Sequence, residues 1–194
     1  MPATETPSPR ERGKGAAWIK PTLSDTFAQA NGLIPRPWHN FYVPAFSIKP
    51  LRPGDAAIAA YRELRIQLWP DCSADCDREI REIIADPARW AVFLGFIEND
   101  RAAGFLELRL RDCAEGATSS PVAYIEGWFV AVEYRRRGLG KALVDAAENW
   151  ALARGCREIA SDTQPENRVS IAAHEHLGYK PVERLVCFLK QLKS

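Results

Sequence analysis

The stretch that decides the fold reads Phe129-Val-Ala-Val-Glu-Tyr-Arg-Arg-Arg-Gly-Leu-Gly-Lys141, and a long amphipathic pattern follows it directly. An apolar strand runs into a short basic turn with two glycines, and a helix begins there. This order brings free backbone N–H groups and a helix N-terminus to one place, where a pyrophosphate can bind. Arginine side chains add positive charge to the same turn. The stretch therefore predicts a site for a phosphorylated cofactor.

The whole chain has the composition of an ordinary globular protein. Of its 194 residues 46% are hydrophobic and 26% are charged, which suits one domain with a real core and some extra length. A formal net charge of +1 gives no reason to expect nucleic acid as a partner. No apolar run approaches the roughly 20 residues of a membrane span, and the N-terminus lacks the apolar core of a secretion signal. We therefore expect a cytoplasmic protein with no membrane partner.

The five cysteines do not form a metal-binding pattern. Cys72-x-x-x-Cys76 has the spacing of half a zinc site, but no second Cys/His pair follows at ligand spacing. An odd number of scattered cysteines favours reduced thiols in the cytoplasm. We expect no metal site.

The first 45 residues differ from the rest. The first fifteen are rich in Pro, Ser, Thr and charge, which predicts disorder, and the aromatic residues that follow have no clear period. Segment 1–45 is therefore interpreted as a partly disordered N-terminal extension. It either lies on the domain surface or on a partner chain, or is a poorly ordered leader. The compact domain is expected over 46–194.

Strand and helix patterns alternate within the compact domain. Strands are predicted over 46–51, 90–98, 102–111, 121–132, 156–161 and 179–192, the second and third as a hairpin. Helices are predicted over 58–68, 78–85, 138–154 and 168–177. The 138–154 helix is the most secure, because its apolar residues keep the helical period over more than three turns and Gly155 can end it. The order indicates an α/β sheet with helices on its faces.

That order of elements, with Arg135-x-x-Gly138-x-Gly140 after the fourth strand, resembles the GNAT superfamily of acyl-CoA N-acyltransferases. Asn167, the helix after it and Leu177-Gly-Tyr179 stand at the distance that the family expects. The resemblance covers about residues 46–192. It implies an α/β (α+β) GNAT-like fold, with a central mixed, mostly antiparallel sheet and helices on both faces, and acetyl-CoA as cosubstrate.

Four shorter stretches resemble one subfamily, the aminoglycoside 6'-N-acetyltransferases of type I. These antibiotic-resistance enzymes acetylate a primary amine with acetyl-CoA. The resemblance implies a polycationic amine as substrate and a homodimer, and nothing in segment 1–45 matches it. The stretches are Leu68-Trp-Pro70, Ser119-Ser-Pro-Val122, Ile125-Glu-Gly-Trp-Phe-Val130 and Ser161-Asp-Thr-Gln-Pro-Glu-Asn167.

By the same resemblance, the pantetheine arm of the cofactor runs beside the fourth strand and its pyrophosphate lies in the basic turn. Glycines suit that turn because a Cβ would block close approach of the backbone to phosphate. The alternative is an ordinary strand-turn-helix with a surface arginine cluster. The predicted cofactor residues are Phe129, Val130, Val132, Arg135, Arg136, Arg137, Gly138, Leu139, Gly140, Lys141, Asn167 and His174. An Asn before a helix is also a routine N-cap, so Asn167 has two interpretations.

Acyl transfer to an amine needs a neutral nucleophile and a stabilised oxyanion. Glu126 is the first candidate for base or amine anchor, and the alternative is a strand carboxylate paired with a neighbouring arginine. Asp162, after the fifth strand, either holds another substrate ammonium or caps the next turn. Backbone N–H groups near Phe129 and Val130, in a bulged fourth strand, are the expected oxyanion donors.

His174 stands where many GNAT enzymes have a tyrosine that protonates the leaving thiolate. Imidazole has a pKa of about 6.5 and can donate a proton, although a thiolate leaves easily without one. We expect His174 to contact the cofactor and His176 to lie on the surface. Trp69 and the acidic run over 71–86 offer a flat face and negative charge to a polyamine sugar. Such a run is also typical of a solvated helix.

Two other functions stay open. One is acetylation of another amine, on a protein, a polyamine or a small metabolite. The other is a non-catalytic acyl-CoA-binding module whose N-terminal aromatic segment docks a partner, against which the intact Glu126, Asp162 and phosphate turn argue. A nucleotide-binding protein is disfavoured, because no Lys-Ser/Thr pair follows the glycines.

Overall fold

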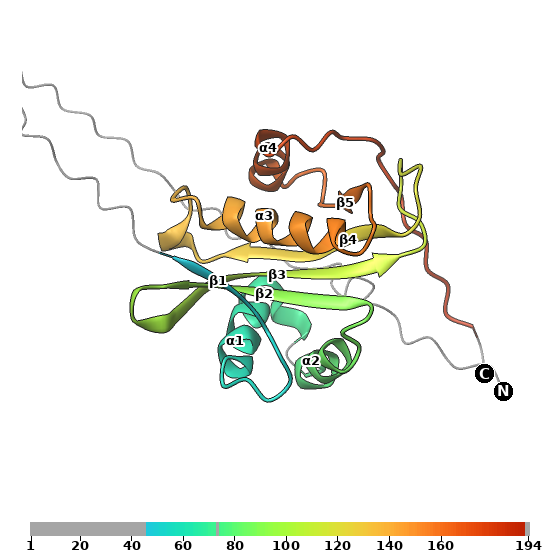
Figure 1. The fold of residues 1–194 in the computed structure, drawn as a ribbon. Coiled ribbons are helices and arrows are strands. Elements are labelled where there is room, and N and C mark those ends of the chain that lie inside the picture. Colours follow the sequence, from blue (N-terminus) through green and yellow to red (C-terminus); the bar gives the residue numbers. More distant parts are fainter. Residues whose placement is uncertain (1–45, 73, 193–194) are drawn as a thin grey trace, which may run out of the picture.

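A computed structural model of the chain describes residues 46–72 and 74–192 (Figure 1). Its one sheet has the order β1-β2-β3-β4-β5, in which β4 and β5 are parallel and all other pairs are antiparallel. The predicted mixed, mostly antiparallel sheet is therefore confirmed. The strands are β1 (Ser47–Pro50), β2 (Trp90–Ile97), β3 (Arg101–Arg111), β4 (Val122–Val130) and β5 (Ile159–Ser161).

Helices cover both faces of this sheet, as predicted (Figure 1). On one face lie α1 (Ile58–Leu68) and α2 (Cys76–Ala85), and on the other lie α3 (Leu139–Leu152) and α4 (Arg168–His176). Short 3-10 turns occur at η2 (Pro70–Cys72), η3 (Glu98–Asp100) and η4 (Val132–Tyr134). Of the helices in the described part of the chain, none has the length and apolar character that a membrane crossing requires.

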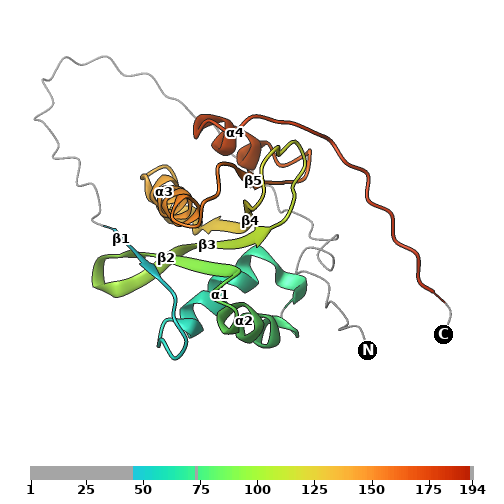
Figure 2. The same cartoon turned by 45° about the vertical axis from the view of Figure 1, so that its right-hand side comes forward.

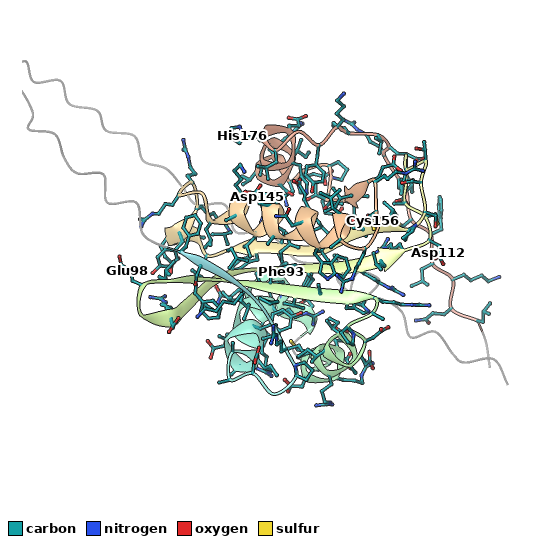
Figure 3. The ribbon with its side chains drawn as sticks, viewed as in Figure 1. Phe93, Glu98, Asp112, Asp145, Cys156 and His176 are labelled. Carbon is teal, nitrogen blue, oxygen red and sulfur yellow. The ribbon has the colours of Figure 1, made fainter. Side chains whose placement is uncertain are left out.

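Each helix layer packs on its own apolar core. Successive side chains of β3 alternate between the two cores, because neighbouring residues of a strand point to opposite faces of the sheet. Leu106 and Leu108 pack with Leu143 of α3, whereas Phe105 packs with Tyr61 of α1. The α3-side core also contains Phe93, which Figure 3 labels near the middle of the sheet. Burial of both sheet faces explains the long apolar runs in the central strands.

A charged network is buried beneath α1. Arg65 is 0% exposed. Its Nε donates a hydrogen bond to Glu107 Oε1 at 2.5 Å, and its Nη1 donates to Glu79 Oε2 at 2.9 Å. The Tyr61 hydroxyl also donates to Glu107 Oε1, at 2.5 Å. Burial raises the pKa of Glu107, and the Arg65 charge opposes that rise. Burial, and then the charge of Glu107, raises the pKa of Tyr61, so the phenol keeps the proton that it donates.

The end of β4 differs from the prediction of a strand over 121–132. The last bond to β3 runs from Ala131 N to Ala103 O at 2.9 Å, after which Tyr134 N donates to Ala131 O and the chain turns as η4. Val132 therefore lies beyond the strand and is 71% exposed. The prediction of Val132 as a strand residue is wrong, because the chain turns as η4 at this residue.

The predicted final strand over 179–192 is wrong for this structure. These residues leave α4 as an extended segment with no ladder partner (Figure 2). Strand-forming side chains make a strand only where a neighbouring strand supplies hydrogen bonds, and β5 pairs with β4 alone among the described strands. Six large apolar side chains of the segment are consequently 57% to 93% exposed. They are Val182, Leu185, Val186, Phe188, Leu189 and Leu192.

We predict that Arg65→Met lowers the free energy of unfolding by about 3–5 kcal/mol, because Glu107 and Glu79 lose their buried counter-ion. Urea denaturation followed by circular dichroism measures this. The matched control is Arg78→Met, since Arg78 binds Asp75 at the surface and its side chain is 37% exposed. We expect no measurable change for that variant. Equal losses in the two variants would contradict the prediction.

Candidate active site

The register between β3 and β4 slips by one residue at Glu126. Glu107 pairs with Gly127 and Leu108 pairs with Ile125, so Glu126 is an extra residue in β4 and forms the predicted β-bulge. The bulge reverses the alternation of side chains along the strand. Ile125 and Trp128 both pack in the α3-side core, whereas Glu126 and Gly127 both turn toward α1.

The sheet opens beside the second half of β4. β4 pairs with β5 only from Ala123 to Ile125, and no described strand lies against that edge further on. Because Ala131 donates to β3, the alternation of an antiparallel ladder turns the backbone groups of Val130 and Trp128 away from β3. Arg135 Nε donates to Val130 O on that open side at 2.8 Å. An extended arm can pair with this edge.

The same alternation separates the predicted strand partners of the cofactor. Phe129 turns its backbone toward β3 and its side chain, 8% exposed, into the α1-side core. Val130 turns its backbone toward the open edge. Trp128, which the sequence did not single out, does the same. Backbone pairing with a ligand on this edge is therefore available to Val130 and Trp128 rather than to Phe129.

The basic turn has the backbone of an anion site. Gly138 is the N-cap of α3 with φ of +90°, a conformation that suits glycine, and it has no side chain to cap the helix. The first N–H groups of α3, from Leu139 to Lys141, lack intrahelical partners and point out at the turn. A Cβ at Gly140 would lie 3.1 Å from Trp128 Cζ2. These features fit the pyrophosphate of a coenzyme A ester.

The cations of this turn are exposed but not equivalent. Arg136 has a left-handed φ of +59°, so its backbone forms part of the turn itself. Lys141 binds Asp145 at 2.7 Å one helical turn further on, and its charge is already balanced. Leu139, 2% exposed, anchors the turn in the core. The positive charge available to a phosphate therefore comes from Arg135, Arg136 and Arg137.

Glu126 does not stand alone in the structure. Its side chain is 2% exposed, and Arg111, the last residue of β3, holds both of its oxygens. Nη2 donates to Oε1 at 2.6 Å and to Oε2 at 2.7 Å, and Nε donates to Oε1 at 2.9 Å. The alternative of a strand carboxylate paired with an arginine thus describes this structure. A role of Glu126 toward a substrate has to be compatible with Arg111.

Asp162 is connected to the same group of side chains. The guanidinium of Arg111 lies 3.6 Å from the ring centroid of Tyr124, and the Tyr124 hydroxyl donates to Asp162 Oδ1 at 2.7 Å. Asp162 follows β5 directly and is exposed. The two carboxylates predicted to bind ammonium groups are therefore brought to one end of the sheet, with an arginine and a tyrosine between them.

Trp69 packs on the bulge from the α1 side. A Cβ at Gly127 would lie only 2.4 Å from Trp69 Cη2, so the indole reaches the backbone of β4 because that residue is glycine. The guanidinium of Arg65 lies 5.0 Å from the indole centroid and ties Trp69 to the buried charged network. Trp69 therefore stands next to Glu126, where the sequence predicted a substrate-binding role for it.

The acidic run over 71–86 is not one free negative surface. Glu79 turns into the core and binds Arg65. Three further carboxylates are engaged in surface ion pairs, namely Asp75, Asp77 and Glu82. A solvated, ion-paired helix therefore describes most of this run.

His174 lies on α4 between two aromatic rings, 5.2 Å from that of Trp128 and 5.3 Å from that of Tyr179. Its Nδ1 is 2.8 Å from the Ser170 carbonyl oxygen. A carbonyl only accepts hydrogen bonds, so Nδ1 carries a proton and Nε2 is protonated only in the charged imidazolium. His174 can thus act as an acid from Nε2 only after gaining a second proton.

Asn167 and His176, at the two ends of α4, have different surroundings. Asn167 Oδ1 accepts from Ser170 N at 3.1 Å, so the N-cap interpretation is confirmed, and the amide NH2 group points to no backbone partner in that cap. His176 is exposed, as expected, and Figure 3 shows it on the side of α4 away from the sheet. Among residues 46–72 and 74–192, no group of acidic, His or Cys side chains has the arrangement of a metal site.

Sequence reasoning missed Arg111, Tyr124 and Gly127. Arg111 and Tyr124 stand at the facing ends of adjacent strands, a position visible in the predicted pattern. The contact of Arg111 with Glu126 and Tyr124 depends on how β3 and β4 pair across the sheet, which neither strand reveals alone. Gly127 was quoted only as part of a motif, and its role as the contact for Trp69 needed the packing of α1 on β4.

The open edge of β4 leads directly to the start of α3, so a long ligand with a phosphate end can lie along both. A coenzyme A thioester has this form, a long arm that ends in a pyrophosphate, and helix N-termini bind pyrophosphate. Residues 55–179 match the family described as "Acetyltransferase (GNAT) family". The chain belongs to this family, and it is an acetyl-CoA-dependent N-acetyltransferase.

Its curated relatives include enzymes from several bacteria. The aminoglycoside N(6')-acetyltransferase type 1 of Stenotrophomonas maltophilia is 40% identical over 148 residues, 76% of this chain and 94% of that protein. The enzyme of the same name from Klebsiella aerogenes is 41% identical over 150 residues, 75% of this chain and 96% of that protein.

Solved structures of similar proteins carry the same fold. Aminoglycoside N-acetyltransferase AAC(6')-Iy in complex with CoA is 33% identical with a TM-score of 0.72, over 82% of this chain and 100% of that one. AAC(6')-Ih from Acinetobacter baumannii is 35% identical with a TM-score of 0.71, over 77% and 100% of the two chains. The predicted GNAT-like fold is therefore confirmed.

We predict that Gly138→Asp abolishes measurable acetyl-CoA binding, because it places a carboxylate and a strained φ at the phosphate turn. Isothermal titration calorimetry checks this. The matched control is Gly155→Asp, which has a similar φ of +78° beyond the other end of α3, with open space around its Cβ position. That variant has similar backbone strain and should bind acetyl-CoA like the wild type. Unchanged affinity in Gly138→Asp would contradict the prediction.

Proposed function

We propose that this protein is an aminoglycoside 6'-N-acetyltransferase, which moves the acetyl group of acetyl-CoA to the 6'-amine and so protects a cell from the antibiotic. The observation that carries the proposal is Glu126, a buried carboxylate on a bulge directly beside the open edge of β4. Relatives with this activity in their names are 40% and 41% identical and are matched over 94% and 96% of their own lengths.

The acetyl donor supplies a thioester, and the residues of this chain hold the reactants around it. Glu126 and Asp162 bind ammonium groups of the acceptor, and Trp69 offers its ring to the sugar. The backbone N–H groups of Val130 and Trp128, on the open edge, donate to the oxyanion that forms at the carbonyl. Phosphates bind at the start of α3, through main-chain N–H groups and the arginines of the turn.

The leaving thiolate needs little help from the protein. Its parent thiol is a stronger acid than an alcohol or amine, with a pKa near that of cysteine, about 8.5. His174 lies beside Trp128 and close to the open edge, so its imidazolium form can donate a proton there. We assign His174 the roles of cofactor contact and optional acid.

We further propose a cytoplasmic homodimer. The described cysteines Cys76, Cys113, Cys156 and Cys187 are free thiols, as expected in a reducing compartment. The segment 179–192 exposes six large apolar side chains, and apolar exposure of this kind favours contact with another protein. A second copy can supply the strand pairing that this segment lacks within one chain.

We predict that deletion of residues 181–194 converts a dimer into a monomer, because the exposed apolar segment is removed. Size-exclusion chromatography with light scattering measures the mass. The control variant is Leu152→Ser, which removes an exposed apolar side chain, 67% exposed, from α3 instead. We expect this control to stay dimeric. A full-length protein that runs as a monomer at micromolar concentration would contradict the proposed dimer.

We predict thiol release from acetyl-CoA with kanamycin- or tobramycin-like acceptors and none with peptide or polyamine acceptors. In Glu126→Gln, kcat/KM for the aminoglycoside should fall by about 100-fold or more, because the acceptor loses an ionised anchor. The KM for acetyl-CoA should hardly change. A thiol reagent measures the rate, and growth of a sensitive bacterium that expresses the gene measures resistance. Turnover with peptides instead would favour the alternative of another amine, and no turnover would favour a binding module.

A further inference from the structure

Arg111 stands closest to the carboxylate that the proposed function assigns to the acceptor amine. We propose that Arg111 stays on Glu126 when the acceptor binds, so that Glu126 anchors the amine while the charge of Arg111 offsets the rise in amine proton affinity that the carboxylate alone would cause. The proton of the amine then leaves to water. This inference rests on the proposed function and concerns how the same site produces a neutral nucleophile.

Arg111 is held too well to be displaced by a substrate. Its guanidinium makes three short contacts with the carboxylate of Glu126 and stacks on Tyr124. The side chain of Glu126 is 2% exposed, against 26% for Arg111. Removing the arginine would leave a buried carboxylate without its counter-ion, which is strongly unfavourable. An acceptor that shares Glu126 with Arg111 avoids this loss.

Glu126 has room for one more hydrogen bond. A carboxylate offers about four lone-pair positions, and Arg111 uses two at Oε1 and one at Oε2. An amine can therefore donate to the remaining position on Oε2. Glu126 can thus hold Arg111 and an acceptor amine at the same time.

An amine on Oε2 lies within a few ångströms of the guanidinium that occupies the same carboxylate. The carboxylate raises the proton affinity of that amine and the guanidinium lowers it, so Arg111 makes the proton easier to lose than it would be beside Glu126 alone. The lost proton passes to water. The neutral nitrogen then attacks the thioester carbonyl, the C–S bond breaks, and the second proton of the nitrogen ends on the thiolate. The products are the amide, the thiol and one released proton.

The other charged groups near this pair have partners of their own. Arg65 binds Glu107 and Glu79 beneath the bulge, and Asp162 accepts a hydrogen bond from Tyr124. Arg109, two residues before Arg111 on the same face of β3, lies over the ring of Trp90 at 5.3 Å. The titratable and charged groups around Glu126 are thus Tyr61, Arg65, Glu79, Glu107, Arg109, Arg111, Tyr124 and Asp162.

The test is the pH dependence of kcat at saturating acceptor and acetyl-CoA, because that profile reports groups in the bound complex. In Arg111→Gln, which keeps a hydrogen-bond donor but removes the charge, the acid limb should lie about one pH unit higher than in the wild type. Arg111→Lys keeps the charge and should restore the limb while raising the KM for the acceptor.

The matched control is Arg109→Gln, which removes the neighbouring arginine of the same strand and should leave the limb in place. Acetyl-CoA binding reports whether each variant is folded. An unmoved acid limb in a folded, active Arg111→Gln overturns the inference. A limb that moves as far in Arg111→Lys, which keeps the charge, as in Arg111→Gln also overturns it. Absence of any turnover by the wild type with aminoglycosides would instead count against the proposed function.

Discussion

The extra residue in β4 is the constraint on which the other features of this site depend. One added residue at Glu126 reverses the direction of every side chain that follows in the strand. Trp128 consequently packs beneath Gly140 on the α3 side, whereas Gly127 meets Trp69 on the α1 side. The phosphate end of the site and its amine end are therefore set by one irregularity, and each uses a different face of the sheet.

Stability and function share residues at this bulge. Glu107 stands opposite Gly127 across the ladder and is bound by Arg65, which also lies over the ring of Trp69. The buried charged network thus supports the wall against which an acceptor would lie. Because its members are fully buried, the network holds its geometry only while each charge keeps its partner. This coupling links the packing of α1 to the position of Glu126.

Local features of the site were predictable from sequence, and features that join distant strands were not. The basic turn and the helix after it were predictable because glycines, arginines and a helix start lie within a few residues of one another. The helix cap at Asn167 was predictable for the same reason. The C-terminal part of the sheet was not predictable, because the strand expected over 179–192 needs a partner strand that the described chain does not provide.

The sequence by itself determined the class of fold, the anion-binding turn and the carboxylates Glu126 and Asp162, since each follows from short motifs and local periodicity. Only the tertiary structure decided that Arg111 binds Glu126 and that Tyr124 joins Arg111 to Asp162. The physical reason is the register of β3 on β4. A slip of one residue changes which side chains meet across a sheet, and nothing local in either strand encodes it.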